Sequence, residues 1–155
     1  AKNVPVNFPK EECINEPVSF GGKEFRINCV SVGNPHCIVF RDELSQEELL
    51  KYGPIIETDK MFPNRTNVQF AHVVNRNLVE IKIWERGVGN TLASGSSSCA
   101  VASAMRKNNL IDADVTIKMP GGELQISIDE EWNIKMTGPV QEICSGVFSK
   151  EMLEA

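Results

Sequence analysis

The stretch "GVGNTLASGSSSCAVASAM", residues 87–105, decides how this sequence is interpreted. Glycines and small hydroxyl residues run directly into small apolar residues, and we expect a helix from about Gly95 to Lys107. A helix with small side chains on every face is generally buried, with other elements packed closely around it. Arg106 and Lys107 come at its C-terminal end, where cations interact favourably with the helix dipole. The stretch therefore predicts a buried central helix that begins in a Gly/Ser-rich turn.

Short strand patterns surround this helix on both sides. Val79, Ile81 and Ile83 alternate along 78–85, which is typical of a strand with one buried face. The expected strands are 25–32 and 36–40 around a turn at 33–35, 67–74 and 78–85 as a hairpin across 75–77, and 115–119, 124–128 and 132–136 around turns at 120–122 and 129–131. Many short strands with about two helices predict an α+β fold, in which a mixed, mostly antiparallel sheet curls around the central helix.

A second helix is expected over residues 44–53, "LSQEELLKYG". Ser45 and Glu48 have the spacing of a capping box at its start, and Gly53 is expected to end it. The chain has no internal repeat and no low-complexity tract. Its 155 residues, numbered 1–155, are therefore expected to form one domain.

Composition excludes several classes of function. The chain is 41% hydrophobic and 24% charged, with a net charge of -5, which is ordinary for a globular protein. It has no basic stripe, so nucleic acid is not an expected partner, and no apolar run approaches the roughly 20 residues needed to span a membrane. Five cysteines include no C-x-x-C pair, so each is expected to be a packed hydrophobe in a reducing, cytoplasmic compartment.

The start of the expected helix could carry chemistry. The first N–H groups of a helix lack internal partners and carry partial positive charge, and a glycine lets a ligand approach the backbone. "ASGSSS" (93–98) is therefore a candidate cradle for a carboxylate or phosphate. An ordinary serine cap on a buried helix explains the same letters equally well.

Three other motifs have both a functional and a purely structural interpretation. "GNPHC" (33–37) and "PNRTNVQF" (63–70) place asparagines beside strands, where they can bind a substrate's ammonium and carboxylate groups or only their own turns. Glu85 ends an otherwise apolar stripe, which is unusual for a carboxylate. With Arg86 it can form a functional pair or a weak surface ion pair.

The order of these motifs is more specific than any one of them. "VGNPHCIVF", "PNRTNVQF", "WERGVGNTLASGSSSCA" and "MTGPV" (136–140) follow one another at intervals that resemble the C-terminal half of diaminopimelate epimerase. The resemblance covers essentially the whole chain. It implies a protein of two similar halves, each a sheet curled around a helix, that face each other across a cleft.

The resemblance also implies an activity without pyridoxal phosphate or metal. One thiolate removes the α-proton of diaminopimelate, and a thiol from the other half returns a proton to the opposite face. Helix N-termini would stabilise the charge that develops on the substrate. The residues that match the family's site are, as catalytic groups, Ser94, Glu85 and His36, and, as substrate-binding groups, Asn34, Asn67, Glu85, Arg86, Gly95 and Ser96.

Ser94 departs from the family's pattern, because it stands where the second catalytic cysteine is expected. A serine hydroxyl is far less acidic than a thiol and makes a poor general base without a partner. Ser94 is either an engineered substitution or a natural divergence. We favour divergence because the following Gly-Thr-Gly is also changed, to "GSS" (95–97).

The other catalytic cysteine belongs to the N-terminal half, which this chain lacks. We therefore expect the isolated chain to be inactive and to associate with that missing half or with itself. Alternatives within the same fold are a racemase or isomerase of another amino acid, including the phenazine-biosynthesis and proline-racemase types. A different class of function is a catalytically dead module that binds carboxylates, and a domain with no ligand is the plainest alternative.

Overall fold

The structure is a computed structural model that describes residues 4–153. Its strands are β1 (Glu16–Phe20), β2 (Lys23–Ser31), β3 (Pro35–Phe40), β4 (Asn67–Asn75), β5 (Leu78–Glu85), β6 (Gly89–Thr91), β7 (Asp114–Met119), β8 (Gly122–Ile128) and β9 (Ile134–Thr137). Its helices are α1 (Gln46–Glu57), α2 (Gly95–Lys107) and α3 (Lys150–Leu153). No helix within the described range has the length and apolar content needed to cross a bilayer.

All nine strands belong to one mixed sheet. Its order is β1-β2-β3-β4-β5-β7-β8-β9, with β6 paired to β5 outside this path. β3 runs parallel to β4 and β5 runs parallel to β7, whereas the other neighbouring strands are antiparallel. The α+β fold and the mostly antiparallel sheet predicted from the sequence are confirmed.

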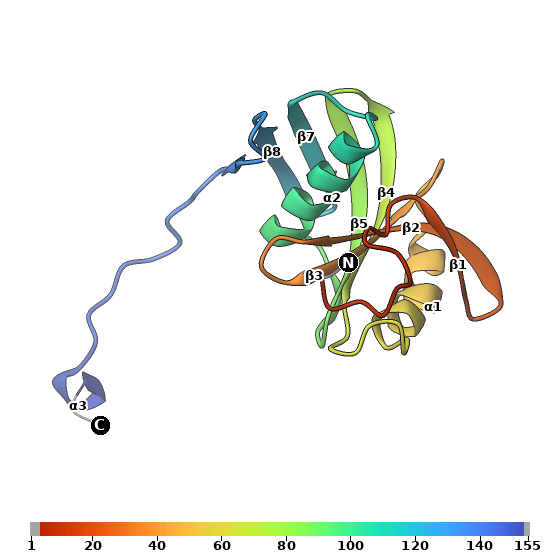
Figure 1. Cartoon of the computed structure of the whole chain (residues 1–155). Coiled ribbons are helices and arrows are strands. Elements are labelled where there is room, and N and C mark those ends of the chain that lie inside the picture. The colour runs from red at the N-terminus through yellow and green to blue at the C-terminus, as the bar shows by residue number, and fades with distance from the viewer. Residues whose placement is uncertain (1–3, 154–155) are drawn as a thin grey trace.

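α2 lies in the hollow of this curled sheet, in contact with β2, β3, β4, β7, β8 and β9 (Figure 1). Ala100, Val101, Ala102, Ala104 and Met105 are completely buried there. The alternating residues of β5 that the sequence analysis assigned to one face belong to the same core. Because the helix side chains are small, strands approach it from several sides, and the predicted bounds of this central helix are confirmed.

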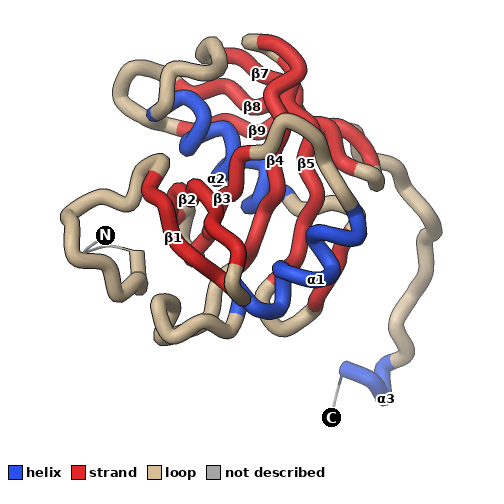
Figure 2. The backbone as a smooth tube through the Cα atoms, turned by 90° about the vertical axis from the view of Figure 1, so that its right-hand side faces the viewer, coloured by secondary structure: helices blue, strands red, loops and turns tan. Residues whose placement is uncertain are grey.

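α1 covers the opposite face of the sheet, against β4 and β5 (Figure 2). A second core fills this layer and includes the aromatic rings of Phe20, Phe25, Phe62 and Phe70. Ser45 caps α1 as predicted, because its hydroxyl accepts a hydrogen bond from the Glu48 amide. Side chains of β3 and β4 thus alternate between an α1 layer and an α2 layer.

Gly53 does not end α1, and this prediction is wrong. The helix continues through Pro54 to Glu57. A Cβ atom at Gly53 would lie 2.8 Å from Cγ of Trp84, so the glycine permits close packing of α1 on β5. The same residue type serves as a helix stop or as a contact point, and sequence alone does not distinguish these uses.

The remaining strands agree with the sequence within a few residues. The hairpin across residues 75–77 and the turns at 33–35, 120–122 and 129–131 are confirmed in position. Three short elements were not predicted: β1, β6 and the four-residue helix α3.

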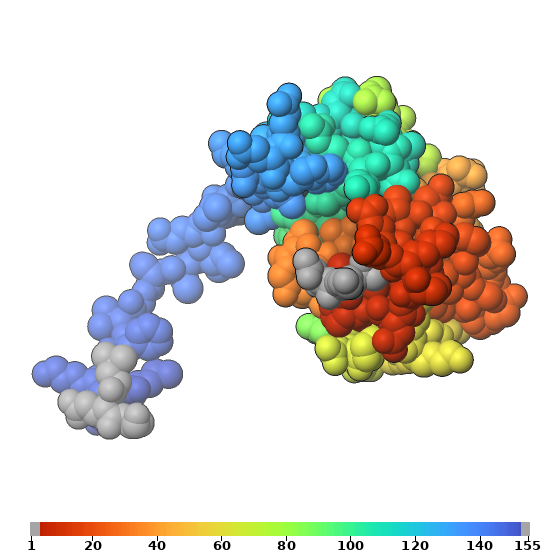
Figure 3. Space-filling model, in the orientation of Figure 1, coloured from red at the N-terminus to blue at the C-terminus, as the bar shows by residue number. Residues whose placement is uncertain are grey.

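The chain beyond β9 leaves the body of the molecule. Residues 138–149 have no regular secondary structure and lead outward to α3 (Figure 3). Val140, Ile143 and Val147 on this tail are exposed by 97%, 96% and 100%. A tail that exposes aliphatic side chains so completely carries apolar surface that the rest of this chain does not cover.

Candidate functional site

The start of α2 is built as a capped helix terminus. Ser94 has extended backbone angles, and its hydroxyl accepts a hydrogen bond from the Ser97 amide at 3.4 Å. The Ser98 hydroxyl donates to the Ser94 carbonyl at 2.9 Å. Ser94 and Gly95 are half-buried and Ser96 is exposed. The serine-cap interpretation is thus confirmed, and the Ser97 amide is the one that the Ser94 side chain satisfies.

Gly95 also accommodates a neighbour from β9. A Cβ atom at this position would lie 3.0 Å from the sulfur of Met136. Met136 lies in the "MTGPV" motif, whose first two residues end β9. Gly95 thus lies against the flexible end of the Met136 side chain at the start of α2.

Asn67 joins three segments at the beginning of β4. Its side-chain amide donates to the Pro35 carbonyl at 2.9 Å, and its side-chain oxygen accepts from the Arg86 backbone N–H at 3.0 Å. Asn67 is 6% exposed. Its carboxamide thus holds the start of β3 against the turn after β5, and its predicted role as a substrate ligand stays a prediction.

His36 is buried beside Asn34. Nε2 of His36 lies 2.9 Å from the side-chain oxygen of Asn34. Burial lowers the pKa of His36 to about 4, and the positive charge of Arg86 acts in the same direction, while hydrogen bonding to Gln69 opposes them. His36 is therefore neutral at pH 7.

Glu85 is the last residue of β5, and Arg86 begins the turn to β6. Glu85 accepts a hydrogen bond from the Thr91 hydroxyl at 3.0 Å, and the Arg86 guanidinium donates to the Asn64 carbonyl at 3.1 Å. They do not pair with each other among the ion pairs of residues 4–153. The surface ion pair considered from the sequence is therefore wrong, and each charge is positioned separately.

Glu57 is a buried carboxylate that the sequence analysis missed. It is 4% exposed and accepts hydrogen bonds from the Gly87 amide at 2.8 Å and from the Trp84 indole N–H at 2.7 Å. Arg65 forms an ion pair with it at 3.4 Å. Glu57 therefore fixes the turn that begins at Arg86, directly after Glu85. The false helix stop at Gly53 hid this role, because Glu57 was left outside the expected helix.

Gln69 was also missed, although a signal for it exists. It follows Asn67 by two residues in a strand, so the two side chains share the face toward α2. Gln69 is completely buried, and its side-chain nitrogen lies 3.0 Å from the Ser97 hydroxyl. A polar residue on the buried face of an otherwise apolar strand requires partners, and this requirement was the available clue.

The predicted residues come from separate segments that meet at one end of the sheet. His36 and Asn67 are direct partners in the parallel pairing of β3 and β4, and the Asn67–Arg86 bond adds the turn after β5. The Gln69–Ser97 contact connects β4 to the first turn of α2. Cys99 lies further along α2, and burial raises its pKa, which disfavours its thiolate.

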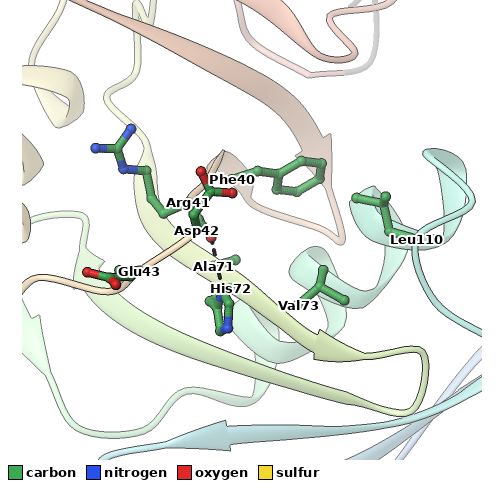
Figure 4. Close-up of a pocket in the computed structure, with 8 residues that line it drawn as sticks. All are labelled: Phe40, Arg41, Asp42, Glu43, Ala71, His72, Val73 and Leu110. Carbon is green, nitrogen blue, oxygen red and sulfur yellow. Dashed lines mark hydrogen bonds between the residues drawn. The ribbon is translucent and has the colours of Figure 1, made fainter.

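A hollow at the far end of the same strands contains none of these residues (Figure 4). Phe40, Arg41, Ala71, His72 and Leu110 are among its lining residues, and His72 Nδ1 lies 3.2 Å from the Arg41 carbonyl oxygen. The candidate site is therefore a separate polar surface at the amino ends of β3 and β4.

This arrangement defines a class of fold that solved structures share. The chain resembles a PhzF-family phenazine biosynthesis protein from Bacillus anthracis with a TM-score of 0.51 at 19% identity, over 78% of this chain and 40% of that chain. A PhzF-family protein from Enterococcus faecalis matches with a TM-score of 0.51 at 13% identity, over 69% of this chain and 40% of that one. At these identities the likeness concerns the fold alone.

Sequence comparison identifies the family. The family model described as diaminopimelate epimerase matches residues 28–143. "Diaminopimelate epimerase 2" of Nostoc sp. is 41% identical over 98% of this chain and 53% of its own length. "Diaminopimelate epimerase" of Agathobacter rectalis is 44% identical over 86% of this chain and 47% of its own length. The chain belongs to the diaminopimelate epimerase family, and it spans about half the length of these curated relatives.

Proposed function

We propose that this chain is the C-terminal half of a pyridoxal-phosphate-independent amino-acid epimerase that interconverts LL- and meso-diaminopimelate. The observation that carries the proposal is the link from Asn67 to both Pro35 and Arg86, beside a capped helix start. This link joins the starts of β3 and β4 to the turn after β5, and the Gln69–Ser97 contact adds the first turn of α2. The names of the Nostoc and Agathobacter rectalis relatives support the choice of substrate.

The chemistry requires stabilisation of negative charge. An α-proton beside an ammonium and a carboxylate is weakly acidic, so the substrate carboxylate is placed against the backbone amides of Gly95 and Ser96. The carboxylate of Glu85 accepts hydrogen bonds from the substrate's α-ammonium group, and Arg86, whose guanidinium donates to the Asn64 carbonyl, positions the turn beside it. Asn34 and Asn67 contribute amide groups to the same substrate. The buried, neutral His36 adds no charge of its own.

Ser94 takes the position of the family's second proton-transfer residue. Its hydroxyl is half-buried at the helix start, where partial positive charge favours an oxyanion. A serine still needs an acceptor for its own proton, and Glu85 serves as that acceptor, directly or through water. The opposing catalytic group comes from the N-terminal half, so the isolated chain does not turn over substrate.

The partner is therefore an N-terminal half-domain. The curated relatives are about twice as long as this chain, and the tail beyond β9 exposes Val140, Ile143 and Val147. Association of two copies of this chain through the same apolar surface is the alternative assembly. Sedimentation of the chain alone, and mixed with the N-terminal half of the Nostoc relative, distinguishes the two.

Deuterium incorporation tests the proposed activity. This chain is fused behind the N-terminal half of the Agathobacter rectalis relative and incubated with meso-diaminopimelate in D2O. Exchange at the α-carbon by the fusion, and none by the isolated chain, is the expected result. Ser94→Cys in the fusion is expected to raise the exchange rate, because a thiol ionises far more readily than a hydroxyl. An unchanged or lower rate places Ser94 outside the proton path.

A carboxylate-binding module without catalysis is the second candidate, and Ser94 is the feature that favours it. Such a module binds diaminopimelate in a calorimetric titration of the fusion but exchanges no deuterium, with or without Ser94→Cys. A racemase or isomerase of another amino acid exchanges a different substrate. A panel of free amino acids in the same D2O assay identifies it.

A further inference from the structure

Two buried polar atoms beside the candidate site have no partner as the side chains stand. They are Nδ1 of His36 and the side-chain oxygen of Gln69. Both residues are completely buried, out of contact with bulk solvent. Each orphaned group in such surroundings is costly, by about 1–3 kcal/mol. We therefore ask whether a hydrogen bond between these two side chains can satisfy both of them.

The protonation of His36 follows from its other nitrogen. The side-chain oxygen of Asn34 lies 2.9 Å from Nε2, and in this orientation of the Asn34 amide Nε2 carries the proton, because an oxygen only accepts hydrogen bonds. The imidazole is neutral at pH 7, which leaves Nδ1 as an acceptor in need of a donor. Gln69 is the polar neighbour: His36 of β3 pairs with Asn67 of β4, and Gln69 follows Asn67 by two residues on the same face.

Rotating the Gln69 amide by half a turn satisfies every group. The amide nitrogen then donates to His36 Nδ1. The amide oxygen takes the present place of the nitrogen, 3.0 Å from the Ser97 hydroxyl, and accepts a hydrogen bond from it. The oxygen and nitrogen of a glutamine are assigned from such networks, because their shapes are nearly identical. Neither nitrogen of His36 nor the oxygen of Gln69 is left unpaired.

We propose that Gln69 is a positioning residue whose amide bridges Ser97 and His36, so that hydrogen bonds run in one direction from the first turn of α2 to Asn34. In this series of hydrogen bonds Ser97 donates to Gln69, Gln69 donates to His36, and His36 donates to Asn34. The Asn34 oxygen thereby accepts from His36, which leaves the Asn34 NH2 group as a donor for a ligand. Asn34 then selects an acceptor on the ligand, such as a carboxylate oxygen.

The inference rests on the proposed function only for the ligand at Asn34. The bridge itself is a property of the folded chain and is measured without substrate. Failure of the deuterium-exchange assay therefore leaves it standing. Conversely, absence of the bridge leaves the proposed epimerase reaction standing.

Nitrogen NMR of the full chain tests the bridge directly. The chain contains two histidines, so His72→Gln assigns the remaining imidazole signals to His36. At pH 7 we expect the pattern of an Nε2–H tautomer and a ¹⁵N–¹⁵N coupling across the hydrogen bond between Gln69 Nε2 and His36 Nδ1. An Nδ1–H tautomer, or no such coupling in the folded chain, overturns the proposal.

Two variants separate positioning from packing. Gln69→Met keeps the length of the side chain but removes both polar atoms, so the coupling is lost and the His36 Nδ1 signal moves toward that of an unbonded nitrogen. Gln125→Met, at an exposed position on β8, leaves the His36 signals unchanged. An unmoved Nδ1 signal in folded Gln69→Met contradicts the proposal. Should Gln69→Met not fold, the wild-type coupling decides the question by itself.

Discussion

Gly53 of α1 packs directly on Trp84 of β5, so closely that a Cβ atom on the glycine would lie 2.8 Å from the indole Cγ. The indole N–H then reaches Glu57, one helical turn further along α1. These two contacts attach the helix to β5 immediately before Glu85, which ends the strand, and Arg86, which begins the turn. The layer opposite α2 thus determines where charged residues of the candidate site lie.

Gly53→Ala is expected to destabilise the chain through this contact. The added methyl group forces Trp84 or α1 to move, at a cost of about 1–3 kcal/mol. Urea denaturation followed by tryptophan fluorescence measures the loss. Gly146→Ala is the matched control, because a Cβ atom at Gly146 meets nothing within 4 Å, and its midpoint is expected to be unchanged. Equal midpoints for both variants would contradict the packing described for Gly53.

Glu57→Gln is expected to loosen the turn after β5. A carboxamide has one acceptor oxygen, so either the Gly87 amide or the Trp84 indole loses its partner, at a cost of about 1–3 kcal/mol. Urea denaturation measures this cost, and hydrogen exchange at the Gly87 amide locates it. Glu142→Gln on the exposed tail removes the same charge without these contacts and should change neither quantity. Unaltered hydrogen exchange at the Gly87 amide would show that Glu57 does not stabilise the turn.

The sequence predicted those elements whose pattern depends only on residues close together along the chain. The small residues of 95–107 and the alternation of 79, 81 and 83 each depend on neighbours along the chain, and both predictions hold. Motif order also named the family correctly. Glu57 and Gln69 were missed because their partners lie 30 and 28 residues away, at Gly87 and Ser97. Such partners become neighbours only after the sheet has curled, and a single sequence carries no direct record of them.

Acid is expected to weaken the fold through His36. Its pKa is about 4 in the folded chain and near 6.5 when unfolded, so between these values the unfolded chain binds more protons. Stability therefore falls as the pH drops from 6.5 to 4, by about 3 kcal/mol at most, and this contribution is complete above 6.5. Urea denaturation at a series of pH values is expected to show a shallower slope in this window for His36→Gln. His72→Gln is the matched histidine substitution and should retain the slope due to His36.

Ser94 has a structural role that must be separated from any role in proton transfer. Its hydroxyl caps α2 through the Ser97 amide, so Ser94→Ala is expected to lower stability by about 1 kcal/mol, as Ser45→Ala should at α1. Ser94→Asp restores an acceptor and adds a negative charge that the helix start favours, so its stability should recover. That same charge repels a substrate carboxylate from the amides of Gly95 and Ser96. In the fusion, Ser94→Asp is therefore expected to be stable and yet slow in α-deuterium exchange, whereas Ser45→Ala is less stable and exchanges at the wild-type rate. If exchange instead follows stability across the three variants, Ser94 acts only as a cap.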